Sequence, residues 1–228
     1  MLDTMQPEMV VIAVLIAFSF AAFYLRLLSI GGIALAAIIG ITAFMLGGVV
    51  PFLALALFYL MAETATWAGR KFAGGERHEQ RTSSNILGNC AAAIVALFFG
   101  QSTAFFGAVS AAFADTVSSE IGLLSRSAPV LITSWKRVEK GTDGGVTLLG
   151  FLAALFAAAI IGLMHYFFVA NSAALAGIIV VSGFAGGAFD SFLGATLQRR
   201  GILTNTQVNF FAGLFGAAVA LALSGTLA

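Results

Sequence analysis

The sequence predicts an all-α membrane protein, a polytopic bundle of about eight transmembrane helices in a single integral membrane domain over residues 1–228. Apolar residues make up 60% of the chain, charged residues make up only 9%, and the mean hydropathy is +1.02. A soluble domain is only about half apolar. Because each transmembrane helix needs about 20 residues, eight helices leave little chain for a soluble domain.

Eight apolar runs carry this prediction. They cover residues 7–25, 30–48, 50–67, 86–100, 102–124, 146–169, 173–198 and 204–227. The division between the fourth and fifth runs rests on Gly100-Gln101-Ser102, so we expect a short turn there. The first residues include Asp3 and Glu8 and no basic residue. A signal peptide begins with basic residues, so we expect the first run to be retained.

The charged residues support the division into eight runs. If the runs cross the membrane alternately, all 11 basic residues fall on one side: Arg26, Arg70, Lys71, Arg77, Arg81, Arg126, Lys136, Arg137, Lys140, Arg199 and Arg200. The positive-inside rule makes that side cytoplasmic and places both termini outside. We expect an integral protein of a prokaryotic inner membrane with a cytoplasmic active face.

The acidic residues follow the same pattern, and this narrows the function. Only Asp3 and Glu8 map to the outside. The other acidic residues map to the same side as the basic residues: Glu63, Glu76, Glu79, Asp115, Glu120, Glu139, Asp143 and Asp190. A transporter usually has polar groups near the bilayer midplane, whereas an enzyme with a cytosolic donor and a lipid acceptor needs polar groups at one face. No basic run typical of nucleic-acid binding occurs. The lone Cys90 rules out an internal disulfide.

The first candidate site is Asp115 to Gly122, read as Asp-Thr-Val-Ser-Ser-Glu-Ile-Gly, at the end of an uncharged run. Acids in such positions are costly unless they face a cavity, a metal or a partner. On a helix, Asp115 shares a face with Ser118 and Ser119. Glu120 lies about 140° away around the helix, so it reaches the same ligand only if the helix ends or unwinds. The structural alternative is a helix cap or an interhelical hydrogen-bond cluster.

The second candidate is a stripe at spacing four in the seventh run, formed by Gly186, Asp190, Gly194 and Gln198. Glycines one turn either side of an acid let a helix or a ligand approach the backbone. Helix packing explains the glycines without explaining Asp190. The third candidate is Arg81, Asn85 and Asn89, whose cation and amides suit a phosphate. Equally, these residues could cap the helix and bond across the bundle.

The fourth candidate joins Lys136 and Arg137 to the turn Gly141-Thr-Asp-Gly-Gly145 before the sixth run. A glycine-rich turn that leads into a helix presents backbone amides to an anion. No GxxxxGK[ST] motif occurs, which excludes a P-loop. Together the four candidates bring carboxylates, amides and cations to one membrane face. Acids can hold Mg²⁺ on a nucleotide, and cations can neutralise a transferring phosphoryl group, so we expect phosphoryl or nucleotidyl transfer to a lipid.

These motifs resemble, in order along the chain, those of the integral-membrane family that includes plant phytyl-phosphate kinase. The resemblance runs from about Glu63 to Asn209. It is most specific at the block from Asp115 to Gly122, and its last motif is Leu203-Thr-Asn-Thr-Gln-Val-Asn209. More distantly, the chain is similar to phytol and dolichol kinases and to CTP-dependent phosphatidate cytidylyltransferases. Asn85 stands where the family is expected to have Gln, and Val-Thr follows the glycines where Val-Ser is commoner.

The resemblance implies phosphoryl transfer from CTP or another nucleoside triphosphate to an isoprenoid monophosphate, giving the diphosphate, with Mg²⁺ as cofactor. Asp115, Glu120 and Asp190 are then the expected metal ligands, and Lys136 is expected to act in catalysis beside them. The expected phosphate and substrate ligands are Arg81, Asn85, Asn89, Ser118, Ser119, Arg137, Thr142, Gly144, Gly145, Gln198, Asn205 and Asn209. The alternatives are a carrier or flippase for isoprenoid phosphates, or a kinase or cytidylyltransferase that acts on a lipid alcohol or another lipid phosphate.

Overall fold

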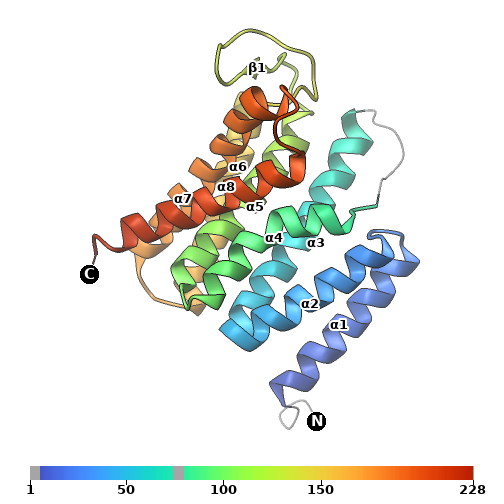
Figure 1. Cartoon of the computed structure of the whole chain (residues 1–228), viewed down its shortest axis with the longest axis vertical. Helices are drawn as coiled ribbons and strands as arrows, with labels where there is room; N and C mark the ends of the chain where they lie inside the picture. The colour runs from blue at the N-terminus through green and yellow to red at the C-terminus, as the bar shows by residue number, and fades with distance from the viewer. Residues whose placement is uncertain (1–5, 74–79, 228) are drawn as a thin grey trace.

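The computed structural model describes residues 6–73 and 80–227 as a bundle of helices with one small hairpin at the end where α5 finishes (Figure 1). Its elements are α1 (Pro7–Tyr24), α2 (Ile30–Gly47), α3 (Val49–Ala73), α4 (Ser83–Phe98), α5 (Ser102–Gly122), β1 (Val130–Leu131), β2 (Gly145–Val146), α6 (Leu148–Phe168), α7 (Ala173–Leu193), η1 (Gly194–Gln198) and α8 (Asn205–Ser224). Four residues of the charge pattern lie outside the described residues: Asp3, Glu76, Arg77 and Glu79.

The all-helical membrane fold and the eight helices predicted from the sequence are confirmed. Five of the described helices are long and apolar enough to cross a membrane, namely α2, α3, α6, α8 and α7 continued through η1. The helices α1 and α4 are apolar but shorter. Large apolar side chains such as Phe20, Met45 and Phe156 are exposed on the outside of the bundle. Exposed apolar surface on this scale fits contact with lipid.

The helix starts follow from capping residues rather than from where the apolar runs begin. The side chains of Thr82, Thr147 and Thr204 accept hydrogen bonds from backbone amides in the first turns of α4, α6 and α8. Such caps satisfy amides that have no partner within the helix. The fourth helix therefore begins at Ser83, three residues earlier than the apolar run predicted. At the other extreme, α3 continues past its apolar run to Ala73.

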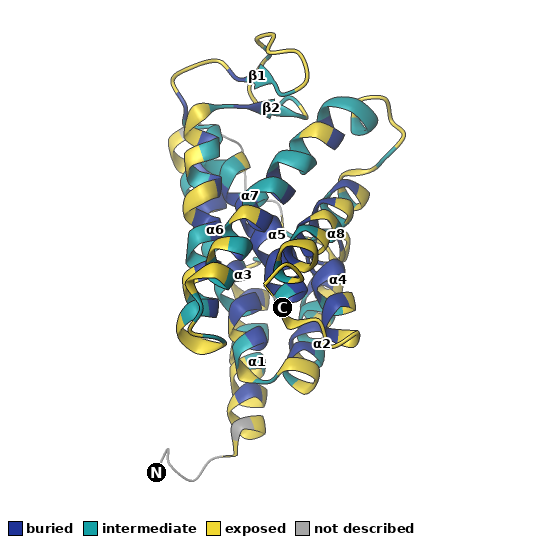
Figure 2. Cartoon of the chain, turned by 90° about the vertical axis from the view of Figure 1, so that its left-hand side faces the viewer, coloured by how far each residue is buried: buried dark blue, intermediate teal, exposed yellow. Residues whose placement is uncertain are grey.

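The centre of the bundle is α5, which packs against α3, α4, α6, α7 and α8. Its residues from Ala104 to Ala114 are all buried (Figure 2). Small residues permit this close packing: a side chain at Gly107 would meet the backbone of Gly216 at 2.7 Å, and one at Gly186 would overlap Ala111. Because its neighbours shield α5 from lipid, the second half of the helix tolerates acids and hydroxyls.

The connection between α5 and α6 forms the hairpin. Strands β1 and β2 pair antiparallel, with Val130 opposite Val146 and Leu131 opposite Gly145. Gly144 has a φ of +74°, and a side chain there would overlap Ala195 of η1. Only glycine fits both the left-handed backbone and the close contact. The turn before β2 therefore lies directly against η1, at the end of α7.

Candidate functional site

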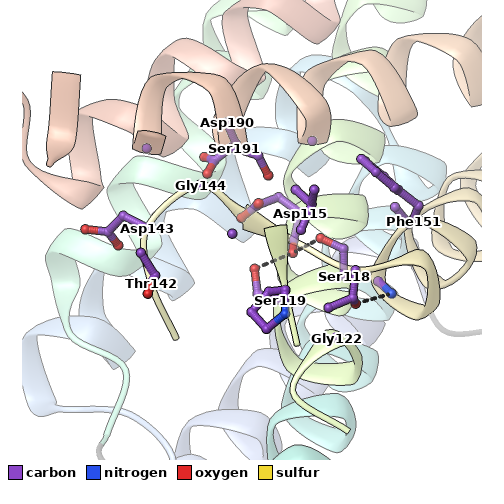
Figure 3. A pocket seen from close by; sticks show the side chains of 18 of the residues that line it. Asp115, Ser118, Ser119, Gly122, Thr142, Asp143, Gly144, Phe151, Asp190 and Ser191 are labelled. Carbon is purple, nitrogen blue, oxygen red and sulfur yellow. Dashed lines mark hydrogen bonds between the residues drawn. The ribbon is translucent and has the colours of Figure 1, made fainter. Parts of the chain in front are cut away.

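A polar cavity of about 300 Å³ lies among α5, the turn before β2, α6, α7, η1 and the start of α8 (Figure 3). Its polar lining combines Asp115, Ser118 and Ser119 with Asp190 and Ser191, while Phe151 and Phe184 form an apolar wall. Thr142, Gly144, Gly145, Gln198 and Asn205 also line it. The first, second and fourth sequence candidates thus meet at one cavity. Only the tertiary packing of α5 against α6 and α7 brings them together.

Asp115 and Asp190 are the paired acids of this cavity. Their carboxyl groups lie within hydrogen-bonding distance of each other. The close approach of α7 to α5 that allows the pairing needs Gly186, because a side chain there would overlap Ala111, one turn before Asp115. Two carboxylates this close repel each other when both are ionised, so the pair favours a shared proton or a bound cation.

The serines hold the cavity face of α5 in place. The hydroxyls of Ser118 and Ser119 each donate to the backbone carbonyl of Asp115 at 2.9 Å. Both oxygens keep lone pairs that can accept a further hydrogen bond. As the helical spacing predicted, Asp115, Ser118 and Ser119 share one face of a continuous helix and line the same cavity.

Asn209 connects this cavity to the third sequence candidate. With one assignment of its amide, Asn209 donates to Oδ1 of Asn89 at 3.3 Å. With the amide turned over, it donates to Oδ2 of Asp190 at 3.2 Å and to the Asn205 carbonyl at 3.1 Å. Either assignment places the amide between α4 and the acid pair. Asn209 therefore lies between Asn89 and Asp190, and neither asparagine is among the residues that line the cavity.

The turn before β2 differs from the expected phosphate cradle. The backbone amide of Thr142 donates to the Glu139 carbonyl at 3.2 Å, and that of Gly145 donates to the Thr142 carbonyl at 2.9 Å. Two of the expected amide donors are therefore already engaged within the turn. The turn nevertheless contributes Thr142, Asp143 and Gly144 to the cavity wall. The turn therefore does not present a full row of free amides to the cavity.

Glu120, the expected third metal ligand, is engaged by α3. Because α5 continues through Gly122, Glu120 turns toward α3. Its Oε1 accepts a hydrogen bond from Thr66 at 2.7 Å, and its Oε2 would be 2.8 Å from a side chain at Gly69. No cluster of three acidic, histidine or cysteine side chains suited to a metal occurs among the described residues. Glu120 reaches the edge of the cavity, but its carboxylate is held by α3.

Arg81 and Asn85 are also used structurally. The Nε of Arg81 pairs with Glu63 at 3.4 Å, and its Nη2 donates to Thr66 at 3.0 Å. Asn85 accepts from the backbone amide of Thr82 at 2.9 Å as the second half of a capping box. Neither residue lines the polar cavity, because these contacts direct the two side chains toward α3 and the helix cap.

The hairpin places a different cation at the site from those expected. Lys136 and Arg137 are exposed on the hairpin and do not line the cavity, because they precede the turn that folds against η1. Lys140 does line it, and its Nζ donates to the Leu123 carbonyl at 2.8 Å. Asp143 lies close enough to Asp190 for their charges to interact. Lys140 precedes Gly141 and Asp143 precedes Gly144, so the glycine-rich turn is the sequence feature that could have indicated both residues.

The family profile of integral membrane proteins called DUF92 matches residues 13–217. The chain belongs to this family. It is 39% identical over 154 residues to an uncharacterized membrane protein of Methanocaldococcus jannaschii, a match that covers 64% of each chain. It is 29% identical over 214 residues to Protein VTE6, chloroplastic, of Arabidopsis thaliana, covering 85% of this chain and 64% of the relative. The family assignment made from the motifs is therefore confirmed.

A further relative of this DUF92 protein is Protein PGR of Arabidopsis thaliana, 42% identical over 114 residues that cover 43% of this chain and 40% of the relative. The chain thus spans no more than 64% of the length of any of these three relatives. No solved structure matches it.

The chemistry available to the DUF92 cavity follows from its lining. Facing carboxyl groups, hydroxyls and one lysine suit a ligand that brings both phosphate oxygens and a divalent cation. Mg²⁺ is commonly held by one or two carboxylates together with substrate phosphates, so a third acid is not required. The residues present therefore fit Mg²⁺, since Asp115 and Asp190 offer carboxylate oxygens at this cavity.

Proposed function

We propose that this DUF92 protein is a membrane kinase that transfers a phosphoryl group from a nucleoside triphosphate to an isoprenoid monophosphate. The observation that carries the proposal is the Asp115–Asp190 pair, which faces a polar cavity at one end of an otherwise apolar bundle. The resemblance to the family of plant phytyl-phosphate kinase supplies the substrate class and favours CTP as donor. The charge pattern of the sequence supports a cytoplasmic site.

Asp115 and Asp190 would hold Mg²⁺, which when bound offsets the negative charge of the donor phosphates. The protein contributes position and charge. Lys140 stands at the cavity edge, where its ammonium group can attract the anionic donor. Gln198 and Asn205 offer amides on the η1 and α8 side, and Ser118 and Ser119 offer hydroxyls on the α5 side. Asn209 orients Asp190 through its amide.

A phosphate acceptor suits the groups at this site. An oxygen of the isoprenoid monophosphate would attack the terminal phosphorus of the donor, and the bond from that phosphorus to the bridging oxygen would break, releasing the nucleoside diphosphate. The attacking oxygen is already ionised at neutral pH, so no general base is needed. The described residues that line the cavity include no histidine. An alcohol acceptor would need a base, which here a carboxylate of the cavity would have to supply.

The test uses the purified full-length protein in lipid nanodiscs with Mg²⁺ and CTP or ATP labelled in the terminal phosphate. The acceptors are geranylgeranyl and phytyl monophosphates and the corresponding alcohols. We expect labelled prenyl diphosphate from the monophosphates, with no product when EDTA removes the divalent cation. Labelled product from the alcohols alone would replace the proposed acceptor. No product from any acceptor, together with nucleotide-independent movement of prenyl phosphate across vesicles, would favour a carrier.

A further inference from the structure

A second cavity, of about 150 Å³, lies among α1, α2, α3 and α4, away from the acid pair. Its walls are almost entirely hydrocarbon and include Leu15 and Phe18 of α1, Ile39 of α2, and Phe52 and Leu55 of α3. We call it the apolar pocket. Phe18 meets the ring of Tyr59 edge to face at 4.9 Å, so α1 and α3 contact each other at the pocket wall.

The apolar pocket opens sideways, toward the lipid-facing surface of the bundle. Two residues that line it are largely exposed: Val14 of α1 at 44% and Leu60 of α3 at 57%. Both stand within helices and not in a connection between helices. A hydrocarbon chain can therefore pass from the bilayer into the pocket without crossing a polar surface, with the rest of the chain left in lipid.

One end of the apolar pocket is polar and incompletely satisfied. Tyr59, Arg81 and Asn89 contribute to its lining. In the described part of the chain the Tyr59 hydroxyl is buried and has no hydrogen-bond partner. A buried hydroxyl without a partner is destabilising, so its retention beside a cavity points to a ligand that supplies the missing bond. Arg81 is paired with Glu63 there, so the donor that this end offers is the Tyr59 hydroxyl, which suits a phosphate oxygen as acceptor.

Two series of side-chain contacts connect this polar end to the polar cavity that contains Asp115 and Asp190. Asn89 meets Asn209, whose amide also faces Asp190. Arg81 meets Thr66, which donates to Glu120 at the cavity edge. A ligand at the polar end would therefore be separated from the acid pair by two asparagines, Asn89 and Asn209. The contact joins the two cavities through packed side chains of α4, α8 and α7.

We propose that the apolar pocket binds the hydrocarbon chain of the acceptor lipid, with the phosphate end directed past Tyr59, Arg81 and Asn89 toward Asp190. This inference rests on the proposed function for the identity of the lipid. The acceptor lipid is then bound by α1–α4, and the nucleotide is bound in the polar cavity of α5–α8. The apolar wall of Phe151 and Phe184 is then not the chain-binding site.

The first experiment locates the chain without requiring catalysis. Geranylgeranyl monophosphate with a diazirine at the chain end is bound to the full-length protein in nanodiscs, photolysed, and mapped by peptide mass spectrometry. We expect labelled peptides from α1, α2 and α3, competed by unlabelled geranylgeranyl monophosphate. Labelling confined to α6 and α7, or labelling that does not respond to competitor, would overturn the inference. Labelling of the expected peptides in a protein without transferase activity would instead overturn the proposed kinase alone.

The second experiment fills the apolar pocket with a matched control on the same helix. Ala36→Leu adds volume inside the pocket, whereas Ala34→Leu adds the same volume at an exposed position two residues away. We expect Ala36→Leu to raise the KM for geranylgeranyl monophosphate about tenfold, while the KM values for dimethylallyl monophosphate and for nucleotide stay near wild type. Equal behaviour of the two variants toward the long-chain acceptor would contradict the assignment.

The third experiment tests the unpartnered hydroxyl. Tyr59→Phe keeps the ring against Phe18 and removes the buried oxygen. Without lipid phosphate the variant should unfold at a higher temperature than wild type, because an unsatisfied polar atom is gone. With geranylgeranyl monophosphate present, its thermal stabilisation by the lipid should be smaller than that of wild type. Undiminished stabilisation by the lipid would show that the hydroxyl does not bind the acceptor.

Discussion

The helices α5–α8 enclose a cavity with acids and hydroxyls, whereas α1–α4 enclose a pocket with hydrocarbon walls. Both regions use closely packed apolar helices, so apolar content does not distinguish them. The difference lies in what each polar side chain meets. On α5, Asp115 meets Asp190 of α7, while Glu120 five positions later meets the hydroxyl of Thr66. An acid facing an acid is available for a cation, and one facing a donor is already satisfied.

The largest effect should come from removing one acid of the facing pair. Asp115→Asn or Asp190→Asn is expected to lower phosphoryl transfer by about a thousandfold, because each leaves the cation with one carboxylate ligand. The fold should persist, since an amide occupies the same volume and the repulsion between carboxylates is relieved. Transfer rates and thermal unfolding of the purified variants test this. A folded Asp115→Asn protein with normal Mg²⁺-dependent transfer would show that the pair does not bind the metal.

The next largest effect should appear where the turn meets η1. Gly144→Ala places a side chain at a backbone φ of +74°, where it also overlaps Ala195. Gly141→Ala places a side chain at a backbone φ of +82°, where no other atom lies within 4 Å. The Gly141 variant should lose about 1–2 kcal/mol of local stability. The Gly144 variant should lose more and should also weaken nucleotide binding, measured by titration calorimetry. Equal effects would mean that the contact with η1 does not shape the site.

A moderate effect is expected from the cation that joins α4 to α3. Arg81→Ala should lower the free energy of unfolding by about 2 kcal/mol, because it deprives Glu63 and Thr66 of a charged partner. The control is Arg137→Ala, which removes an exposed cation from the hairpin and should leave the unfolding temperature unchanged. Thermal unfolding in nanodiscs compares the two. A comparable loss in the Arg137 variant would indicate a role for the hairpin cation that its exposure does not explain.

The smallest effect should come from Glu120, which the sequence grouped with the metal ligands. Glu120→Gln keeps a carbonyl oxygen to accept from Thr66, so stability should change by less than about 1 kcal/mol. Transfer should stay near the wild-type rate and keep the same dependence on Mg²⁺ concentration. An increase in the Mg²⁺ concentration needed for half-maximal transfer, seen in a Mg²⁺ titration of the rate, would return Glu120 to the metal site.

Much of the site was predictable because its parts are local. The spacing of Asp115, Ser118 and Ser119 places them on one helical face, and the glycines around Asp190 signal a close approach. The cations were less predictable, since the choice among Lys136, Arg137 and Lys140 depends on how the hairpin folds back over α7. Loop paths depend on contacts between distant segments, and these contacts leave little trace in local sequence spacing.

The sequence by itself determined the helical membrane fold, its eight apolar segments and the polar character of one set of helix ends, because hydropathy and charge act residue by residue. The partners of each polar group were decided only by tertiary structure. Glu63 and Glu120 look as exceptional in the sequence as Asp115, yet Arg81, just before α4, pairs with Glu63, and Thr66 of α3 bonds to Glu120. Asp115 meets Asp190 because two helices pack at a glycine, a pairing that 74 intervening residues hide from local patterns.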